Sequence, residues 1–161
     1  MPIAITLYNS VLALHIAAVL AAFGVVLAYP VMYSVALRLE PRAMPAIHRI
    51  QDHVGRYVIT PGMVVVLAAG IYLAADKSQF KELYVQWGFA AIVVLGALVG
   101  AYFAPRERRL AELAERDVTA AGDGEVAWGA DYGALRHQVA SVNLLAIVIV
   151  LSTIFVMVVK P

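Results

Sequence analysis

The chain has 161 residues, of which 63% are hydrophobic and 14% are charged, and its formal net charge at pH 7 is +1. A soluble domain of this size could not hide so much apolar surface, and the small net charge gives no indication of nucleic-acid binding. The absence of cysteine excludes disulfides, thiolate metal sites and iron–sulfur clusters. These features predict one domain embedded in a lipid bilayer.

Four segments of the chain contain no charged side chain. A hydrocarbon core ~30 Å thick is spanned by about 20 apolar residues in helical conformation, and each segment meets or nearly meets that length. We therefore predict an all-α fold, a four-helix transmembrane bundle formed by a single domain over residues 1–161. The charge-free segments are 1–37, 57–75, 83–105 and 137–159, and the predicted spans are about 7–36, 57–76, 83–105 and 137–159.

The distribution of basic residues predicts the orientation of the bundle, because short cytoplasmic loops collect Lys and Arg. The second connection contains only Lys77 and Lys81, whereas the first and third contain all nine arginines. Both termini should therefore face outward, in a multi-pass protein of the cell membrane, the plasma membrane or a bacterial inner membrane. The arginines are Arg38, Arg42, Arg49, Arg56, Arg106, Arg108, Arg109, Arg116 and Arg136.

The first span is expected to begin near Leu7 or Tyr8. Its apolar run is too long for a signal peptide and lacks a basic start. Pro30 should kink this helix by removing one backbone hydrogen bond.

The second span follows a predicted short interfacial helix over residues 46–56. Pro61 lies about one turn inside the span. It occupies the tolerated first turn if the helix begins near Ile59, and it marks a bend if the helix begins near Ile47. Both alternatives are open at the level of the sequence.

The third span follows a tight outer loop over residues 76–82. Tyr84 and Trp87 stand where aromatic side chains favour the membrane–water boundary. The span should run inward to Pro105.

One segment, residues 105–136, is predicted to lie outside the membrane. Its apolar residues recur at helical spacing, which indicates an amphipathic cytoplasmic helix over about 105–121, between the third and fourth spans. This helix is either a solvated extension of the third span or a docking surface for another protein. Trp128 and Tyr132 are predicted anchors at the interface. The apolar residues are Leu110, Leu113, Ala114 and Val118.

Small residues at intervals of four predict close helix crossings, because small side chains let backbones approach in a membrane. They occur in the first and third spans. Such a stripe serves either packing within the bundle or contact with a second copy of the chain. The residues are Ala13, Ala17, Ala21, Gly96, Gly100 and Ala104.

His15 is the most distinctive polar residue within the spans, since a titratable side chain at membrane depth usually faces a partner or a cavity. One hypothesis is a neutral imidazole hydrogen-bonded to Tyr72, Ser152 or Thr153. The other is a ligand to haem iron or another metal, with Met157 as second ligand, as five-coordinate haem, or as a symmetric pair across a dimer.

The other three histidines lie near the opposite membrane edge, roughly 20 Å or more from His15 at ~1.5 Å per residue. His48 and Asp52 share a helix face, and His53 and His137 could join them in a metal or phosphate-facing cluster. Solvated side chains are the alternative. Asn143, in the fourth span, is expected to form an interhelical hydrogen bond.

The spans contain no nucleophile–base pair, phosphate-binding glycine loop or acidic relay. This argues against a proton pump, an ATPase and a membrane protease.

Several short motifs resemble a family of predicted bacterial integral membrane proteins with four helices and no known function. They include Leu14-His15 with Pro30, the stretch from Arg56 to Met63, and Gly70 to Leu73. The segment after Pro105 and the terminal Met157 to Pro161 are similar to that family too.

A more distant resemblance is to membrane protoporphyrinogen oxidases and to copper-resistance D-type membrane domains. It implies binding of haem b or a porphyrin, with His15 as axial ligand. The positions that carry it are His15, Arg56, Pro61, Arg136, Asn143, Lys160 and Pro161.

Two functions are therefore predicted. The first is an accessory or assembly subunit of a membrane complex, with a partner membrane protein or a second copy at the 106–136 segment and the small-residue stripes. The second is a haem- or porphyrin-binding membrane redox protein that uses His15.

Overall fold

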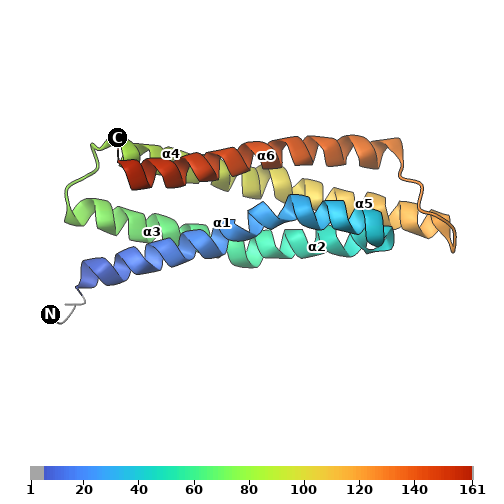
Figure 1. Ribbon diagram of the computed structural model, residues 1–161, viewed down its shortest axis with the longest axis horizontal. Coiled ribbons are helices and arrows are strands. Elements are labelled where there is room, and N and C mark those ends of the chain that lie inside the picture. The colour runs from blue at the N-terminus through green and yellow to red at the C-terminus, as the bar shows by residue number, and fades with distance from the viewer. Residues whose placement is uncertain (1–5, 161) are drawn as a thin grey trace.

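The computed structural model describes residues 6–160, and these residues contain helices and no strand. Four long helices lie side by side (Figure 1). Each is long and apolar enough to cross a membrane, which confirms the predicted class of fold. Residues 1–5 of the first apolar run and Pro161 lie outside the described residues.

The first and fourth long helices are single elements, whereas the second and third are each built from several. The first is α1 (Leu7–Leu39) and the fourth is α6 (Ala130–Val159). The second runs through η1 (Pro41–Ala43), α2 (Met44–Val54), η2 (Gly55–Ile59) and α3 (Thr60–Asp76). The third runs through α4 (Leu83–Ala97), η3 (Leu98–Phe103) and α5 (Ala104–Ala121).

The helices alternate in direction, so the connections gather at two ends of the bundle. The start of α1, the α3–α4 connection and the end of α6 lie at one end (Figure 1). The α1–α2 turn and the α5–α6 loop lie at the other end, which we call the arginine-rich end because its connections, with the adjoining helical residues 38–56 and 106–136, contain all nine arginines.

The long helices extend beyond the charge-free segments. They contain 33, 36, 39 and 30 residues, which corresponds to roughly 45–58 Å at 1.5 Å per residue. Towards the arginine-rich end α2 packs against α5. The apolar side of α5 is therefore buried within this chain, in a cluster of apolar residues from several helices. The cluster consists of Ala36, Met44, Leu110, Leu113, Ala114, Tyr132 and Val139.

Pro61 and Pro105 lie inside the second and third long helices, and each follows a π-helical turn. Pro61 comes after the π-turn Gly55–Ile59, and Pro105 comes after Leu98–Phe103. Proline has no N–H and its ring clashes with the preceding turn, and a widened turn relieves this clash. The helix that contains Pro61 runs without a break from Pro41 to Asp76, so it begins well before Ile59 and the first alternative is wrong.

The closest helix crossing joins α1 to α3. A methyl group at Gly62 would lie 2.8 Å from Cβ of Ala22, so only glycine permits this approach. The buried small residues of α1 near this crossing are Ala18 and Ala22. They stand one position beyond the predicted stripe, whose residues Ala13, Ala17 and Ala21 are exposed.

Candidate functional site

Five polar side chains meet inside the bundle towards the arginine-rich end, and all four long helices contribute to them. We call this set the buried polar cluster. His48 and Tyr132 are 0% exposed, Gln51 is 4% exposed and Glu107 is 7% exposed. The members are Tyr33 of α1, His48 and Gln51 of α2, Glu107 of α5 and Tyr132 of α6.

His48 is the centre of the cluster. Its Nδ1 lies 2.7 Å from Oε2 of Glu107, and its Nε2 lies 3.1 Å from the hydroxyl of Tyr132. A carboxylate only accepts hydrogen bonds, so Nδ1 carries the proton and, in the neutral ring, Nε2 accepts from Tyr132. A buried carboxylate is tolerated here because it is paired and hydrogen-bonded.

Tyr33 and Gln51 complete the shell around the carboxylate. The Tyr33 hydroxyl lies 3.1 Å from Oε2 of Glu107 and also contacts the Gln51 amide. With its nitrogen turned towards the carboxylate, Gln51 donates to the same Oε2 at 3.0 Å. Glu107 therefore accepts hydrogen bonds from three side chains.

Helical spacing explains how the sequence brings these residues together. Met44, His48 and Gln51 follow one another at i, i+4 and i+7 and form the buried face of α2. Glu107 stands three residues before Leu110 on the buried face of α5. Glu107 was missed because residues 106–136 were predicted to lie outside the membrane, although an acid in register with an apolar stripe signals burial.

A cavity of about 580 Å³ adjoins the cluster, and we call it the arginine cavity. Its lining changes from apolar to charged along the bundle. The apolar part includes Phe23, Ile59, Leu95 and Val150, and the polar part includes Tyr29, Tyr33, Gln51, Asp52, Arg56, Glu107, Arg108, Arg136 and Asn143.

The Tyr29 hydroxyl is an exception among the buried groups of this region. Its oxygen is buried, and it has no hydrogen-bond partner among the described residues. Buried polar atoms are nearly always satisfied, so an unpaired one in a cavity wall needs an explanation. Both π-turns also line the cavity, through Gly55 and Gly100 among others. Such turns are frequent at functional sites.

His15 lies in a second cavity, of about 420 Å³, which we call the His15 cavity. Its Nδ1 is 3.0 Å from the carbonyl oxygen of Val66. The partner of His15 is thus a backbone carbonyl rather than Tyr72, Ser152 or Thr153. Met157 lines the same cavity, so the two side chains predicted as haem ligands, His15 and Met157, both belong to its wall.

The predicted metal cluster is not assembled. His48 belongs to the buried polar cluster, Asp52 pairs with Arg108, and Nδ1 of His53 lies 2.8 Å from the carbonyl oxygen of Arg49. His137 is exposed on α6. Within residues 6–160, no three His, Asp or Glu side chains form a group that could hold a metal ion.

The remaining polar residues predicted within the bundle are Ser152, Thr153, Asn143 and Tyr72. Ser152 and Thr153 donate to the carbonyl of Ile149 at 2.9 and 2.7 Å. Trp87 donates to Thr153 at 3.1 Å, which is an interhelical bond between α4 and α6. Asn143 lines the arginine cavity and Tyr72 is half-buried.

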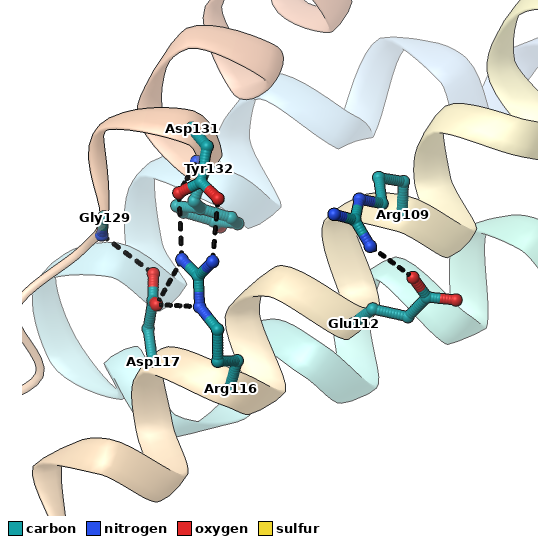
Figure 2. Close-up of polar contacts among 7 residues, drawn as sticks. All are labelled: Arg109, Glu112, Arg116, Asp117, Gly129, Asp131 and Tyr132. Atoms are coloured by element: carbon teal, nitrogen blue, oxygen red, sulfur yellow. Dashed lines mark hydrogen bonds and ion pairs between the residues drawn. The ribbon is translucent and has the colours of Figure 1, made fainter.

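An ionic clasp ties the loop before α6 to α5 (Figure 2). The Arg116 guanidinium donates to both oxygens of Asp131 at 2.7 and 2.8 Å and to Asp117 at 2.7 Å. Asp117 also accepts from the N–H of Gly129 at 2.8 Å. These residues lie outside the charge-free segments, where the hydrogen bonds from Arg116 hold the pKa of Asp131 well below its ordinary value.

The clasp lies next to two aromatic residues, Trp128 in the loop and Tyr132 in the first turn of α6. Tyr132 is next to Asp131 in the chain and is fully buried, and Trp128 stacks on its ring at 4.5 Å between centroids. Tyr132 is therefore a core residue and a hydrogen-bond partner of His48. The prediction that it is an interfacial anchor is wrong.

Comparison of the chain with protein-family models, curated proteins and solved structures found no match to any of them. The resemblances inferred from the sequence motifs stay predictions.

Proposed function

We propose that this protein binds an amphipathic small molecule in the arginine cavity. The tail of the molecule would lie among the apolar residues, and its head would lie beside the buried polar cluster. The observation that carries the proposal is the arginine cavity itself, whose wall grades from apolar to charged and presents the unpaired Tyr29 hydroxyl. Its volume of about 580 Å³ lies within the ~300–1,000 Å³ typical of small-molecule sites.

The orientation predicted from the arginines indicates that this molecule would come from the bilayer. With the arginine-rich end on the cytoplasmic side and both termini outside, the charged part of the cavity lies near the inner surface of the cell membrane. An amphipathic molecule in that leaflet has its head at the same depth. The cavity would therefore receive its ligand from the bilayer.

Substitution of Gly100 tests the proposal. Gly100 lines the cavity, and a methyl group there would meet no atom within 4 Å. We expect Gly100→Leu to occupy the cavity and Gly100→Ala to leave it open. Photolabelling of the purified protein with a long-chain alcohol that carries a diazirine should modify cavity residues. We expect this labelling to fall about tenfold in Gly100→Leu, equivalent to ~1.4 kcal/mol, and to persist in Gly100→Ala.

The position of the label decides the result. Peptide mapping should place it on the walls around Leu95 and Val150. Equal labelling of Gly100→Leu and the wild type, with both proteins folded, would overturn the proposal. Labels confined to the outer surface of the bundle would do the same.

A haem or porphyrin site at His15 is a second candidate function, and one observation favours it. Because a carbonyl only accepts, the Nδ1 proton of His15 donates to Val66 and the lone pair of Nε2 remains for a ligand. Histidines that bind metals commonly donate their other N–H in this way. The residues present fit an axial ligand, and a bound haem would supply electron transfer.

His15→Ala tests this second candidate. We expect a Soret absorption in the purified wild type that the substitution abolishes, because the imidazole would be the axial ligand. Met157→Leu has similar volume and should keep the chromophore if the iron is five-coordinate. A colourless wild-type protein, purified after expression with added haem precursor, would exclude a haem at His15.

An accessory role in a membrane complex remains a prediction from the sequence. In this chain α2 covers the apolar side of α5, so a partner there would meet the charged side. A deletion of residues 106–125 would test for such a partner poorly, because it would remove Leu110 from the core as well as the charged side of α5.

A further inference from the structure

We infer that the ligand of the arginine cavity is an acidic amphiphile with one alkyl chain, whose carboxylate or phosphate head pairs with Arg56 and Arg136. This inference rests on the proposed function and adds the chemical class of the ligand. Its basis is the distribution of charge on the cavity wall.

Two of the carboxylates on the wall already have partners. Both oxygens of Asp52 accept from Nε of Arg108, at 3.2 and 3.1 Å. Glu107 accepts from His48 at 2.7 Å. Among the described residues, neither carboxylate lies within 4.0 Å of a basic side chain other than these partners.

Arg56 and Arg136 are the cations that remain. Both line the cavity, and among residues 6–160 no carboxylate lies within 4.0 Å of either guanidinium. Arg136 is half-buried. Arg56 is exposed, and both arginines directly precede the predicted spans. A partly buried guanidinium beside an apolar wall is costly without a counter-charge. Its planar donors match carboxylate and phosphate oxygens, which makes an oxyanion the complementary head.

Tyr29 supplies a neutral donor for the same head. Its hydroxyl is buried in the cavity wall and unpaired among the described residues. A phenolic O–H donates readily to an anionic oxygen. The three groups come from three long helices: Tyr29 from α1, Arg56 from η2 and Arg136 from α6.

The apolar part of the cavity limits the tail. The whole cavity has a volume of about 580 Å³, which is roughly 20 times the ~30 Å³ that a water molecule occupies in the liquid. A methylene group is of comparable size, so one alkyl chain with its head fills the space and two chains exceed it. Phe23, Ile59 and Leu95 would enclose the chain.

Competition against the diazirine alcohol tests the head group. The competitors share one chain length and differ only in the head: a carboxylate, a phosphate, an alcohol and a trimethylammonium. Inorganic phosphate without a chain is the fifth competitor. We expect the carboxylate or the phosphate, or both, to displace the label at tenfold or lower concentration than the alcohol. The ammonium should be weaker than the alcohol, and inorganic phosphate should not compete.

The arginines are then removed. The double variant Arg56→Gln, Arg136→Gln should lose the preference for acidic heads while the alcohol competes as before. Arg109→Gln is the matched control, because Arg109 is exposed, pairs with Glu112 at 3.0 Å and is not part of the cavity wall (Figure 2). It should keep the full preference. If the double variant does not fold, the competition of the different head groups on the wild-type protein still tests the preference for acidic heads.

The possible failures are distinguishable. If the alcohol displaces the label as well as the acids do, the acidic class is wrong and binding in the cavity stands. If inorganic phosphate alone competes, the ligand is a free anion and the amphiphile is excluded. If Gly100→Leu is labelled like the wild type, the proposed function itself fails.

Discussion

His48→Ala is expected to lower the free energy of unfolding by about 3–5 kcal/mol, because it leaves the buried Glu107 carboxylate without its closest partner. Glu107 would keep its position at 7% exposure without its closest partner, and the Tyr132 hydroxyl would lose its acceptor. Unfolding of the purified protein in mixed micelles of increasing SDS content, followed by tryptophan fluorescence, measures the change.

The matched control is His53→Ala on the same long helix. His53 is exposed and bonds only to a backbone carbonyl of its own helix, so its loss should stay within about 0.5 kcal/mol. Equal destabilisation by the two variants would show that the contact between His48 and Glu107 contributes no more to the free energy of unfolding than the exposed His53 does.

A double replacement separates stability from function at the same pair. His48→Leu with Glu107→Met keeps similar volumes and replaces both members of the buried pair with apolar side chains, and such swaps are often neutral or stabilising. We expect most of the loss seen in His48→Ala to be recovered. Recovery of stability would imply that the polar pair is retained for the ligand site that it borders.

The number of long apolar helices could be predicted because the solvent dictates it. A bilayer requires uninterrupted apolar helix, and the four charge-free segments correspond to the four long helices. The buried polar cluster could not be predicted in the same way. Its key contacts join residues 59 and 74 positions apart, and pairing across helices leaves no local pattern.

The place of His15 within the first long helix could be predicted, but its partner could not. Three hydroxyl-bearing side chains lay at a similar predicted depth, whereas the structure pairs His15 with the carbonyl of Val66. Every residue has a carbonyl, so the sequence cannot single one out. Pro61 shows a related limit, since a first-turn proline and a bend were both compatible with its position. The π-turn that admits it depends on packing on either side.

Gly62→Leu is expected to destabilise the bundle by about 1–3 kcal/mol, because overpacking forces a close crossing apart. A methyl group there would lie 2.8 Å from Cβ and 3.5 Å from Cα of Ala22, and backbone cannot move aside as a side chain can. In a membrane this packing is a main source of helix association.

Gly24→Leu provides the matched control for Gly62→Leu, since it makes the same change in the neighbouring helix where a methyl group would meet no atom within 4 Å. Leucine has the higher helix propensity, so this variant should be neutral or slightly more stable. The SDS titration measures both variants. Because the chain has no cysteine, a disulfide between cysteines introduced in α1 and α3 can report their separation directly. Equal stability and equal cross-linking of the two variants would mean that the α1–α3 crossing is looser than the structure shows, and that the wall formed by α1 and α3 around the His15 cavity is looser too.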